Sequence, residues 1–292
     1  MTEEPAPAVS GVAGLVWVGD GLLEAERAAV SVFDHGLVTG DGVFETIELR
    51  EGRPFALRRH LARLNRSAAG LGLVAPAPGL VEAAVEAVAA AAVHRSGILR
   101  ITWTAGPGPL GSVRGAGPPL LVVANGPAPS WSNGRGKPPG EAVAIVPWRR
   151  NERGALTGLK TTSYAENVRA LAEARRRGAS EAIFANTAGE LCEGTGANVF
   201  VVWEGRLCTP ALECGCLAGV TRELVLEVIE ASEEHLPLVA LTEASEAFLT
   251  STTRGVRPIA AVDGTALPSV PGPLTTAACA AFLACTEGND DP

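Results

Sequence analysis

The sequence lacks the features of membrane, secreted and nucleic-acid-binding proteins. No apolar run reaches the roughly 18 residues that a membrane-spanning helix needs. The first residues, MTEEPAPAV, are acidic, whereas a secretory signal begins with basic residues. Acidic residues outnumber basic ones by 32 to 24, so no positive excess is available for a phosphate backbone. Because 47% of the residues are hydrophobic, the chain can bury a core, and we expect a cytoplasmic globular protein that acts on a small molecule.

The chain also lacks a recognisable metal-ligand motif. Its histidines stand far apart, at positions 35, 60, 94 and 235. Its six cysteines stand at 192, 208, 214, 216, 279 and 285. Cys214-Gly-Cys216 has one residue too few between its thiols for a zinc knuckle. This spacing predicts reduced, structural thiols and no metal site.

Lysine is nearly absent, since 22 of the 24 basic residues are arginine. The two lysines are Lys137, in a Gly/Pro-rich run, and Lys160, in the stretch LTGLKTTSYAEN. An amine can lose its proton and attack a carbonyl, which a guanidinium group cannot do. The uncharged neighbours of Lys160 favour partial desolvation and a nucleophilic amine. The alternative is a surface lysine, and composition alone leaves both interpretations open.

Hydrophobic periodicity predicts a mixed α/β chain with two domains. Apolar spacing predicts helices over 55–72, 80–93, 164–177, 219–231 and 274–285. Strands are predicted over 14–19, 28–33, 40–49, 98–104, 120–123, 142–147, 181–186, 198–203, 206–209, 246–250 and 256–262. The run NGPAPSWSNGRGKPPG, residues 125–140, predicts an interdomain loop. The predicted domains are therefore a small N-terminal one, 1–124, and a larger C-terminal one, 141–292.

Residues 106–111, GPGPLG, have the spacing of a dinucleotide-binding turn. Two prolines fill the motif, and residues 112–119 do not resemble the helix that would hold a pyrophosphate. The sequence therefore predicts a tight turn that lines a substrate, with Ala105 at its start.

Two charged residues could belong to a site. Glu193 stands among small residues in GELCEGTGANVF, with no basic neighbour in the sequence. Its ordinary interpretation is a turn carboxylate in water. Arg63 lies on the predicted helix 55–72, where a solvated face is the default.

Two stretches could bind an anion. GCLAGVTR, residues 215–222, leads into a helix, so the amides of Val220 and Thr221 would face an anion. TSTT, residues 250–253, places hydroxyl groups at the end of a strand. Each stretch also has an ordinary interpretation, because Gly and Thr cap helices. Taken together, an amine, a carboxylate, an arginine and two anion-binding stretches are the parts of a pyridoxal phosphate site.

Six stretches, in their order and spacing, resemble the class IV aminotransferases, which are fold-type IV pyridoxal phosphate enzymes. They are DHGLVTGDGVFETI, HLARLNRSAAGLGL, GLKTTSYAENV, GASEAIFANTAGELCEGTGANVFVVWEGRLCTP, GCLAGVTRELVLE and AFLTSTTRGVRPI. The resemblance runs from about residue 15 to residue 265. It implies a small N-terminal α/β domain, a larger C-terminal domain built round a pseudo-barrel, a homodimer, and pyridoxal 5′-phosphate in the cleft between the domains.

The resemblance also implies the roles of individual residues. Lys160 would carry the cofactor and shuttle the proton, and Glu193 would contact the ring nitrogen. Leu217 would pack on the ring. The implied phosphate ligands are Arg63, Val220, Thr221, Ser251 and Thr252.

Within the family, the sequence favours the 4-amino-4-deoxychorismate lyases. Thr39, Thr46 and Glu48 stand where branched-chain aminotransferases commonly have other residues. D-amino-acid aminotransferases trap the substrate carboxylate with two arginines in the loop after the third strand. Here that loop, TAGPGPLG at 104–111, is followed by no arginine before Arg114. GDGVFET together with TAGPGPLG resembles the lyase branch best, although some lyases also have an arginine in this loop.

The expected reaction is therefore release of 4-aminobenzoate and pyruvate, with Thr39 and Ala105 in contact with the substrate. One alternative is an aminotransferase that acts on a branched-chain-type or other amino acid with a 2-oxo acid acceptor. The other is a non-catalytic relative that only binds. Ala218, where proline is common in the family, is a minor departure from the pattern.

Overall fold

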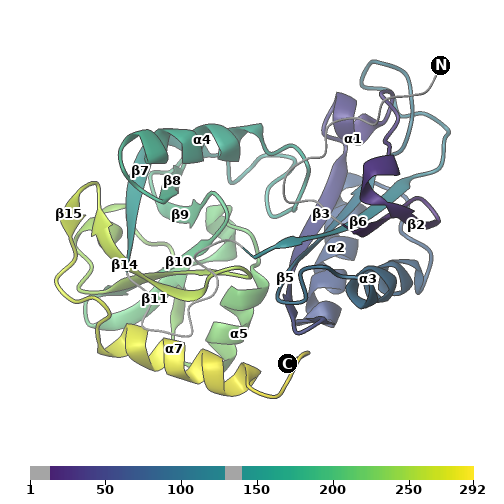
Figure 1. The fold of residues 1–292 in the computed structure, drawn as a ribbon. Coiled ribbons are helices and arrows are strands. Elements are labelled where there is room, and N and C mark those ends of the chain that lie inside the picture. The colour runs from purple at the N-terminus through teal and green to yellow at the C-terminus, as the bar shows by residue number, and fades with distance from the viewer. Residues whose placement is uncertain (1–13, 129–139) are drawn as a thin grey trace. The chain divides into compact units, whose positions relative to one another are not determined.

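The computed structural model describes residues 14–128 and 140–292, which form two compact units (Figure 1). Unit 1 holds residues 14–128, Leu159–Ser163 and Asp291, and unit 2 holds the other described residues. The predicted mixed α/β fold is confirmed, because both units combine strands with helices. The predicted loop 125–140 starts too early, since the strand Leu120–Pro127 runs into it, and its central part, 129–139, lies outside the described residues.

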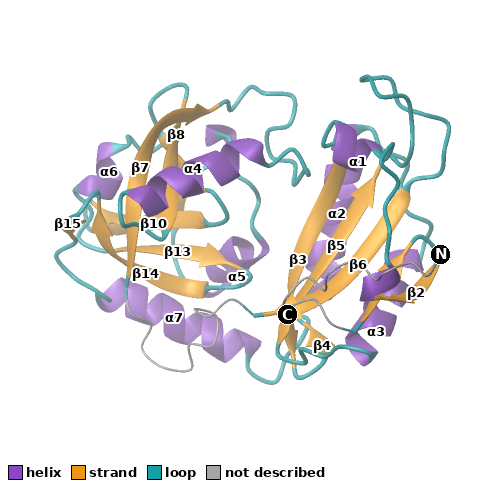
Figure 2. Ribbon diagram, turned by 45° about the horizontal axis from the view of Figure 1, so that its top comes forward, coloured by secondary structure: helices purple, strands orange, loops and turns teal. Residues whose placement is uncertain are grey.

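Unit 1 is built on a six-stranded antiparallel sheet, in the order β2-β1-β6-β5-β3-β4 (Figure 2). The strands are β1 (Leu15–Val18), β2 (Gly21–Glu24), β3 (Gly42–Arg50), β4 (Arg53–Pro54), β5 (Gly97–Thr104) and β6 (Leu120–Pro127). Buried and partly exposed residues alternate along β5 and along the second half of β3. This period of two is typical of a sheet that turns one face to a core.

Helices α2 (Leu57–Leu71) and α3 (Leu80–Ala90) pack against this sheet. Leu64 of α2 and Val85 of α3 are almost fully buried in one hydrophobic cluster with Ile101 of β5. Both helices confirm the prediction from apolar spacing within a few residues. Two shorter helices precede β3, namely η1 (Ala25–Arg27) and α1 (His35–Val38).

Residues 28–33 do not form the predicted strand. The first hairpin is made by β1 and β2 instead, and 28–33 follow η1 as an irregular segment. Val32 is 69% exposed and Phe33 is 50% exposed. These apolar residues therefore lie on the surface of unit 1. An apolar run in the sequence does not distinguish such exposed residues from those of a buried strand.

Unit 2 contains a nine-stranded mixed sheet, with β12-β11-β10-β13-β14-β7-β8-β9 in sequence and β15 paired to β14. Its strands are β7 (Glu141–Arg150), β8 (Glu181–Asn186), β9 (Leu191–Gly194), β10 (Asn198–Trp203), β11 (Arg206–Pro210), β12 (Ser232–Glu234), β13 (Ala247–Ser251), β14 (Gly255–Val262) and β15 (Thr265–Ala266). Its helices are α4 (Ala165–Arg176), η2 (Leu212–Cys214), α5 (Val220–Val228), α6 (Val239–Thr242) and α7 (Pro273–Thr286). Among the described residues, no helix is both long and apolar enough to cross a membrane.

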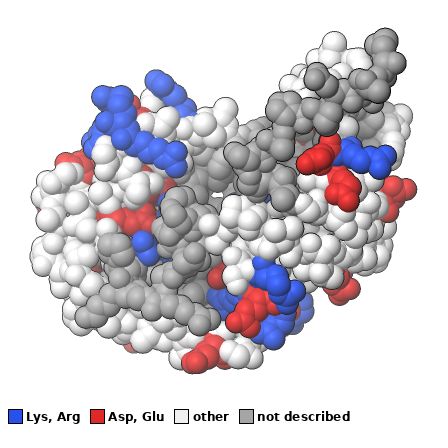
Figure 3. All heavy atoms as spheres, in the orientation of Figure 1, with Lys and Arg blue, Asp and Glu red and all other residues white. Residues whose placement is uncertain are grey.

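The core of unit 2 is centred on strands β10 and β13. Phe200 and Phe248 face each other in register on these strands, are fully buried, and stack with ring centroids 4.8 Å apart. Basic side chains gather on the surface over α4, and elsewhere on the drawn face charges of both signs are mixed (Figure 3). Other charged residues of unit 2, such as Glu181 and Arg222, are buried.

The predicted helix 219–231 is too long. Helix α5 ends at Val228, because Ile229 has an extended backbone with φ −140° and ψ 145°. Residues Ser232–Glu234 then form β12, parallel to β11. Residues 229–231, the last predicted helical turn, instead lead into this paired strand.

The segment Leu159–Ser163 lies within the predicted C-terminal domain 141–292 but packs with unit 1. Thr161 forms a bridge with Val43 at the start of β3. On the other side, Leu159 packs closely on Gly70 of α2, where an added Cβ would lie 2.6 Å from Leu159 Cδ2 and would require that side chain to move. The boundary drawn from composition places this segment in the C-terminal domain, whereas its contacts belong to unit 1.

Candidate functional site

Lys160 has a backbone that is fixed on two sides within unit 1. Its carbonyl accepts a hydrogen bond from Phe44 N at 3.0 Å, and its N–H donates to Ser67 Oγ at 3.1 Å. The first bond comes from β3 and the second from α2. A flexible four-carbon side chain thus starts from a rigid backbone, which suits an amine that must reach a reacting atom and move away again.

The Lys160 side chain is half-buried, as its uncharged neighbours predicted. Its Nζ lies 4.3 Å from the centroid of the Phe44 ring, and Phe44 is buried. The aromatic face gives the amine an apolar neighbour in place of water.

Next to Lys160 in unit 1 lies a buried charged cluster of Glu45, His60 and Arg63. Arg63 binds the Glu45 carboxylate in a bidentate manner, with Nε to Oε1 at 2.8 Å and Nη2 to Oε2 at 2.7 Å. His60 Nδ1 lies 2.7 Å from Glu45 Oε2. Burial alone would raise the pKa of Glu45, but the charge and hydrogen bonds of Arg63 and the contact with His60 lower it to about 2. Burial lowers the pKa of His60, and the nearby positive charges of Arg63 and Lys160 act in the same direction.

Arg63 is therefore not the solvated helix residue of the ordinary interpretation, since it is only 5% exposed. A guanidinium group has five N–H donors, and Glu45 takes at least two of them. The carboxylate fixes the plane of the guanidinium group, so any phosphate that Arg63 contacts would meet a preset donor geometry.

The two predicted substrate residues also lie in unit 1. Thr39 is exposed at the end of α1, and its hydroxyl donates to His35 O at 3.0 Å. Ala105 is partly buried after β5, and its N–H donates to Asp41 O at 3.0 Å. Arg114, the arginine beyond the turn, forms a bidentate pair with Asp41 at 2.6 and 2.7 Å. The Arg114 guanidinium is thus engaged by a carboxylate of this same unit.

In unit 2, Glu193 at β9 is held by groups from two other segments. Its Oε2 accepts a hydrogen bond from Leu217 N at 2.9 Å, and its Oε1 lies 3.4 Å from Arg150 Nε. Arg150, on β7, also donates to Glu166 Oε2 at 2.8 Å and to Asn167 Oδ1 at 3.0 Å. Glu193 is therefore not a turn carboxylate in water. It is a carboxylate whose orientation is fixed by a backbone amide and a guanidinium group.

A polar network supports the residues that follow Glu193. Thr195 O accepts hydrogen bonds from Tyr164 Oη at 2.7 Å and from Asn167 Nδ2 at 2.6 Å. Thr195 N donates to Glu181 Oε1 at 2.9 Å. Burial raises the pKa of Tyr164, and the negative charge of Glu193 raises it further. Tyr164 thus stays a neutral hydrogen-bond donor beside the Glu193 carboxylate.

The start of α5 has the properties of an anion cradle. Its N-cap is Gly219, which makes no side-chain cap, so the first N–H groups have no acceptor from the cap. A Cβ at this position would overlap Asn198 Oδ1, so a larger residue here would require the Asn198 side chain to move. Asn198 also donates from Nδ2 to Leu217 O at 2.8 Å, which fixes the turn before the helix.

Two hydroxyl groups add to this cradle from β13, which packs against α5. Thr250 Oγ1 and Ser251 Oγ are both buried and have no hydrogen-bond partner among the described residues. A buried hydroxyl without a partner costs free energy, so such groups are typical of a ligand site. Thr252 follows in the turn after the strand and is partly exposed.

The predicted site residues thus form two groups, one in each unit. Lys160, Arg63, Thr39 and Ala105 belong to unit 1. Glu193, Leu217, Val220, Thr221, Ser251 and Thr252 belong to unit 2. Four partners were missed from sequence, namely Glu45, His60, Arg150 and Tyr164. Only Tyr164 gave a signal, because it is the single tyrosine of the chain and lies four residues after Lys160.

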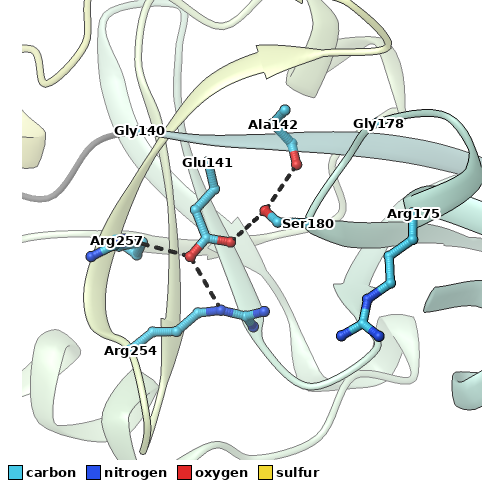
Figure 4. A pocket seen from close by; sticks show the side chains of 8 residues that line it. All are labelled: Gly140, Glu141, Ala142, Arg175, Gly178, Ser180, Arg254 and Arg257. Atoms are coloured by element: carbon cyan, nitrogen blue, oxygen red, sulfur yellow. Dashed lines mark hydrogen bonds and ion pairs between the residues drawn. The ribbon is translucent and has the colours of Figure 1, made fainter. Parts of the chain in front are cut away.

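A further pocket of about 380 Å³ in unit 2 contains none of the predicted site residues. Glu141 points into it and meets Arg254 Nε and Arg257 Nε, each at 3.3 Å, and Ser180 Oγ at 2.8 Å (Figure 4). Arg254 also binds Glu181 at 2.6 Å. The two carboxylates thus pair with Arg254 and Arg257, Arg175 adds a further positive charge to the lining, and Glu181 links the pocket to the network behind Glu193.

Comparison with known proteins gives a consistent result. The sequence model of the family "Amino-transferase class IV" matches residues 42–262. A protein of Methanocaldococcus jannaschii assigned as a branched-chain-amino-acid aminotransferase is 32% identical over 257 residues, which is 85% of this chain and 88% of that protein. The D-alanine aminotransferase of Bacillus licheniformis is 31% identical over 266 residues, which is 87% of this chain and 90% of that protein.

Solved structures agree with these relatives. The branched-chain aminotransferase of Thermoproteus uzoniensis, solved with norvaline, superposes with a TM-score of 0.86 at 32% identity, over 96% of this chain and 97% of that one. Other similar structures were solved with pyridoxal phosphate or pyridoxamine phosphate bound.

The buried Glu45–Arg63 pair gives a pH-dependent prediction. Because the pKa of Glu45 falls from 4.5 to about 2 on folding, its stabilisation is complete above pH 4.5 and is lost as the pH falls towards 2. We expect Glu45→Gln to lower the free energy of unfolding by about 3 kcal/mol at pH 6. The difference from wild type should shrink between pH 4.5 and 2, as measured by urea unfolding across this range. Glu48→Gln, on the same strand but partly exposed, should show little effect; a Glu45→Gln deficit that is independent of pH would contradict the assignment.

Proposed function

The chain belongs to the class IV aminotransferase family, and from this premise we propose that it transfers an amino group from a small apolar amino acid to a 2-oxo acid. The observation that carries the proposal is the match to aminotransferases over at least 85% of the chain. The lyase reaction that the sequence favoured has no support among these relatives, and the alternative drawn from the sequence is closer. The family depends on pyridoxal 5′-phosphate, so the predicted cofactor is confirmed.

Each unit contains residues whose chemistry fits this cofactor. When bound, pyridoxal phosphate supplies an aldehyde that takes up an amino group and a pyridine ring that accepts electrons. Lys160 would hold the cofactor through Nζ and would move a proton at the substrate Cα, with its backbone fixed by Phe44 and Ser67. Glu193 would keep a proton on the ring nitrogen, because Leu217 N–H and Arg150 orient its carboxylate. Leu217 would pack on the ring.

The phosphate would bind at the start of α5. The amides of Val220 and Thr221 and the hydroxyls of Ser251 and Thr252 would contact it. The buried Ser251 Oγ without a partner supports this assignment, as does the equally unpartnered Thr250 Oγ1 next to it. Arg63, preset by Glu45, would add a positive charge.

Two classes of donor are consistent with the relatives, since the chain is about equally similar to an L-branched-chain type and to a D-alanine enzyme. The lack of a second arginine near the 104–111 turn, and the pairing of Arg114 with Asp41, favour a branched-chain-type donor. Thr39 and Ala105 are the proposed substrate contacts, and both are small enough to leave room for a branched side chain.

The protein also has a surface suited to a homodimer. Six large apolar side chains of unit 1 are 45–73% exposed, namely Val30, Val32, Phe33, Leu37, Leu110 and Val113. The two segments that carry them are joined, because Gly108 N donates to Phe33 O and His35 N donates to Gly106 O. A continuous exposed apolar patch of this kind is typical of a protein interface.

The reaction is tested by omission of the acceptor. Purified protein saturated with pyridoxal phosphate should convert L-leucine or L-valine only when 2-oxoglutarate is present, and D-alanine more slowly. Lys160→Ala should reduce turnover by at least about 10³-fold, since no other group replaces the amine, whereas Lys137→Ala should not. Sustained release of pyruvate and 4-aminobenzoate from aminodeoxychorismate without an acceptor would instead establish the lyase.

The phosphate cradle is tested by removal of its unpartnered hydroxyl groups. Ser251→Ala should weaken cofactor binding by about 10- to 100-fold, the cost of one hydrogen bond to a charged group. The cofactor-free variant should be as stable as wild type or more stable, because a buried unpartnered hydroxyl is lost. Cofactor titration by fluorescence and thermal unfolding measure the two effects, with exposed Thr265→Ala as the control. A Ser251→Ala variant that binds the cofactor normally would exclude this position as a ligand.

The dimer is tested by a charge placed in the apolar surface. Wild type should have about twice the chain mass of 29.9 kDa in light scattering after size exclusion. Phe33→Glu should shift the protein towards the monomer, because a carboxylate would be buried in an apolar contact. Val74→Glu, at a 71% exposed residue of unit 1 outside this surface, should remain dimeric. Equal masses for the two variants would place the interface elsewhere.

A further inference from the structure

Three potential metal ligands meet in unit 2 although the sequence separates them. Glu190 lies in the turn before β9, Cys214 ends η2, and His235 follows β12. Their ligand atoms all lie within 4.8 Å of one another. Separations of 24 residues between Glu190 and Cys214 and of 21 between Cys214 and His235 hide this cluster from any motif search. None of the three belongs to the proposed cofactor site.

The two distances from Cys214 Sγ match the edges of a tetrahedral zinc site, and the contact of His235, which is made to the other oxygen of Glu190, is shorter. Cys214 Sγ lies 3.6 Å from Glu190 Oε2 and 3.6 Å from His235 Nδ1. His235 Nδ1 lies 3.0 Å from Glu190 Oε1. Tetrahedral bonds of about 2.3 Å to sulfur and about 2.0–2.1 Å to nitrogen or oxygen separate the ligand atoms by roughly 3.4–3.6 Å. A metal ion could thus be placed among the three atoms with small side-chain adjustments.

The arrangement does not suit a catalytic relay. In a Cys–His–Glu relay, the thiol contacts one ring nitrogen and the carboxylate contacts the other. Here both the thiol and the carboxylate approach Nδ1 of His235. Three such side chains that converge on one point are typical of a site that binds one ion.

The cluster has a supporting shell and a path to solvent. Asn186, fully buried on β8, donates from Nδ2 to Glu190 Oε2 at 2.7 Å, and its Oδ1 accepts from Glu190 N at 2.9 Å. Such contacts orient a ligating carboxylate. Cys214 is buried, whereas the side chain of His235 is 56% exposed, so an ion can enter from the His235 side.

We propose that Glu190, Cys214 and His235 bind one zinc ion per chain, with a water molecule as fourth ligand. Sulfur, imidazole and carboxylate ligands in a tetrahedral set are the combination that zinc prefers. Binding converts the Cys214 thiol to a thiolate and releases its proton to solvent, with no change in oxidation state.

The site would act as a clip between two segments. Glu190 lies three residues before Glu193, and Cys214 lies three residues before Leu217. These segments already meet through the hydrogen bond from Leu217 N to Glu193. A metal ion bound by Glu190 and Cys214 would join the same two segments a second time and would hold the turn that leads to α5. The ion would thus stabilise unit 2 without touching a reacting group.

Cobalt provides the test, because a thiolate bound to Co²⁺ absorbs light by charge transfer. Full-length protein loaded with pyridoxal phosphate, without a polyhistidine tag and under a non-thiol reductant, is freed of metal and titrated with Co²⁺. We expect one ion per chain, a thiolate-to-cobalt absorption band and displacement by Zn²⁺. Zinc at 100 times its Kd should raise the thermal midpoint by roughly 5 °C.

Variants separate this site from incidental binding. Cys214→Ser should abolish the band, and His235→Gln, at an exposed position that should not affect folding, should weaken binding at least about tenfold. The matched controls Cys285→Ser and His94→Gln should bind as wild type does. A wild-type protein that gives no band, or a band that survives Cys214→Ser, would overturn the proposal.

Discussion

The hydrogen bond from the Leu217 N–H to the Glu193 carboxylate is the contact around which the functional part of unit 2 is organised. It joins β9, which carries the acid, to the turn that leads into α5. Each partner is fixed again from its own side, Glu193 by Arg150 and Leu217 O by Asn198. The orientation of the acid and the path of the chain into the anion cradle are therefore determined together. A change in one of the two segments must be felt in the other.

In unit 1, buried charged groups fix the orientation of the candidate site residues. Glu45, His60 and Arg63 form a cluster in which each group is stabilised only while the others are present. The cluster lies on β3 and α2, the same two elements that hold the backbone of Lys160. The backbone of Lys160 is thus fixed by strand pairing and helix packing, whereas its side chain is a flexible four-carbon stem. A fixed backbone with a flexible side chain suits an amine that must both bind a partner and release it.

Features with local causes could be predicted from the sequence. Helices α2 and α3 follow from apolar spacing, and the approach to α5 from its glycines. The scarcity of lysine singled out Lys160 as a candidate, and its catalytic role stays a prediction. Partners that depend on long-range pairing could not be predicted. Arg150 lies 43 residues before Glu193, and nothing in its own neighbourhood marks it. The segment 28–33 was mistaken for a strand because its apolar residues, which are exposed in the structure, have the same pattern in sequence as residues of a core. The branch of the family that the sequence favoured has no support among the relatives, since the loops that distinguish reactions are short and have no periodicity.

The placement of Leu159–Ser163 has a consequence for the way the chain is made. The chain leaves unit 1, starts unit 2 with β7, returns to unit 1 for these five residues, and then completes unit 2. During synthesis from the N-terminus, the sheet and helices of residues 14–128 are available first, but the bridge from Val43 to Thr161 forms only after another 30 or so residues have left the ribosome. Neither unit is an independent segment of the gene. Exchange of one domain between relatives by a single cut would therefore separate Lys160 from the strand and helix that hold its backbone.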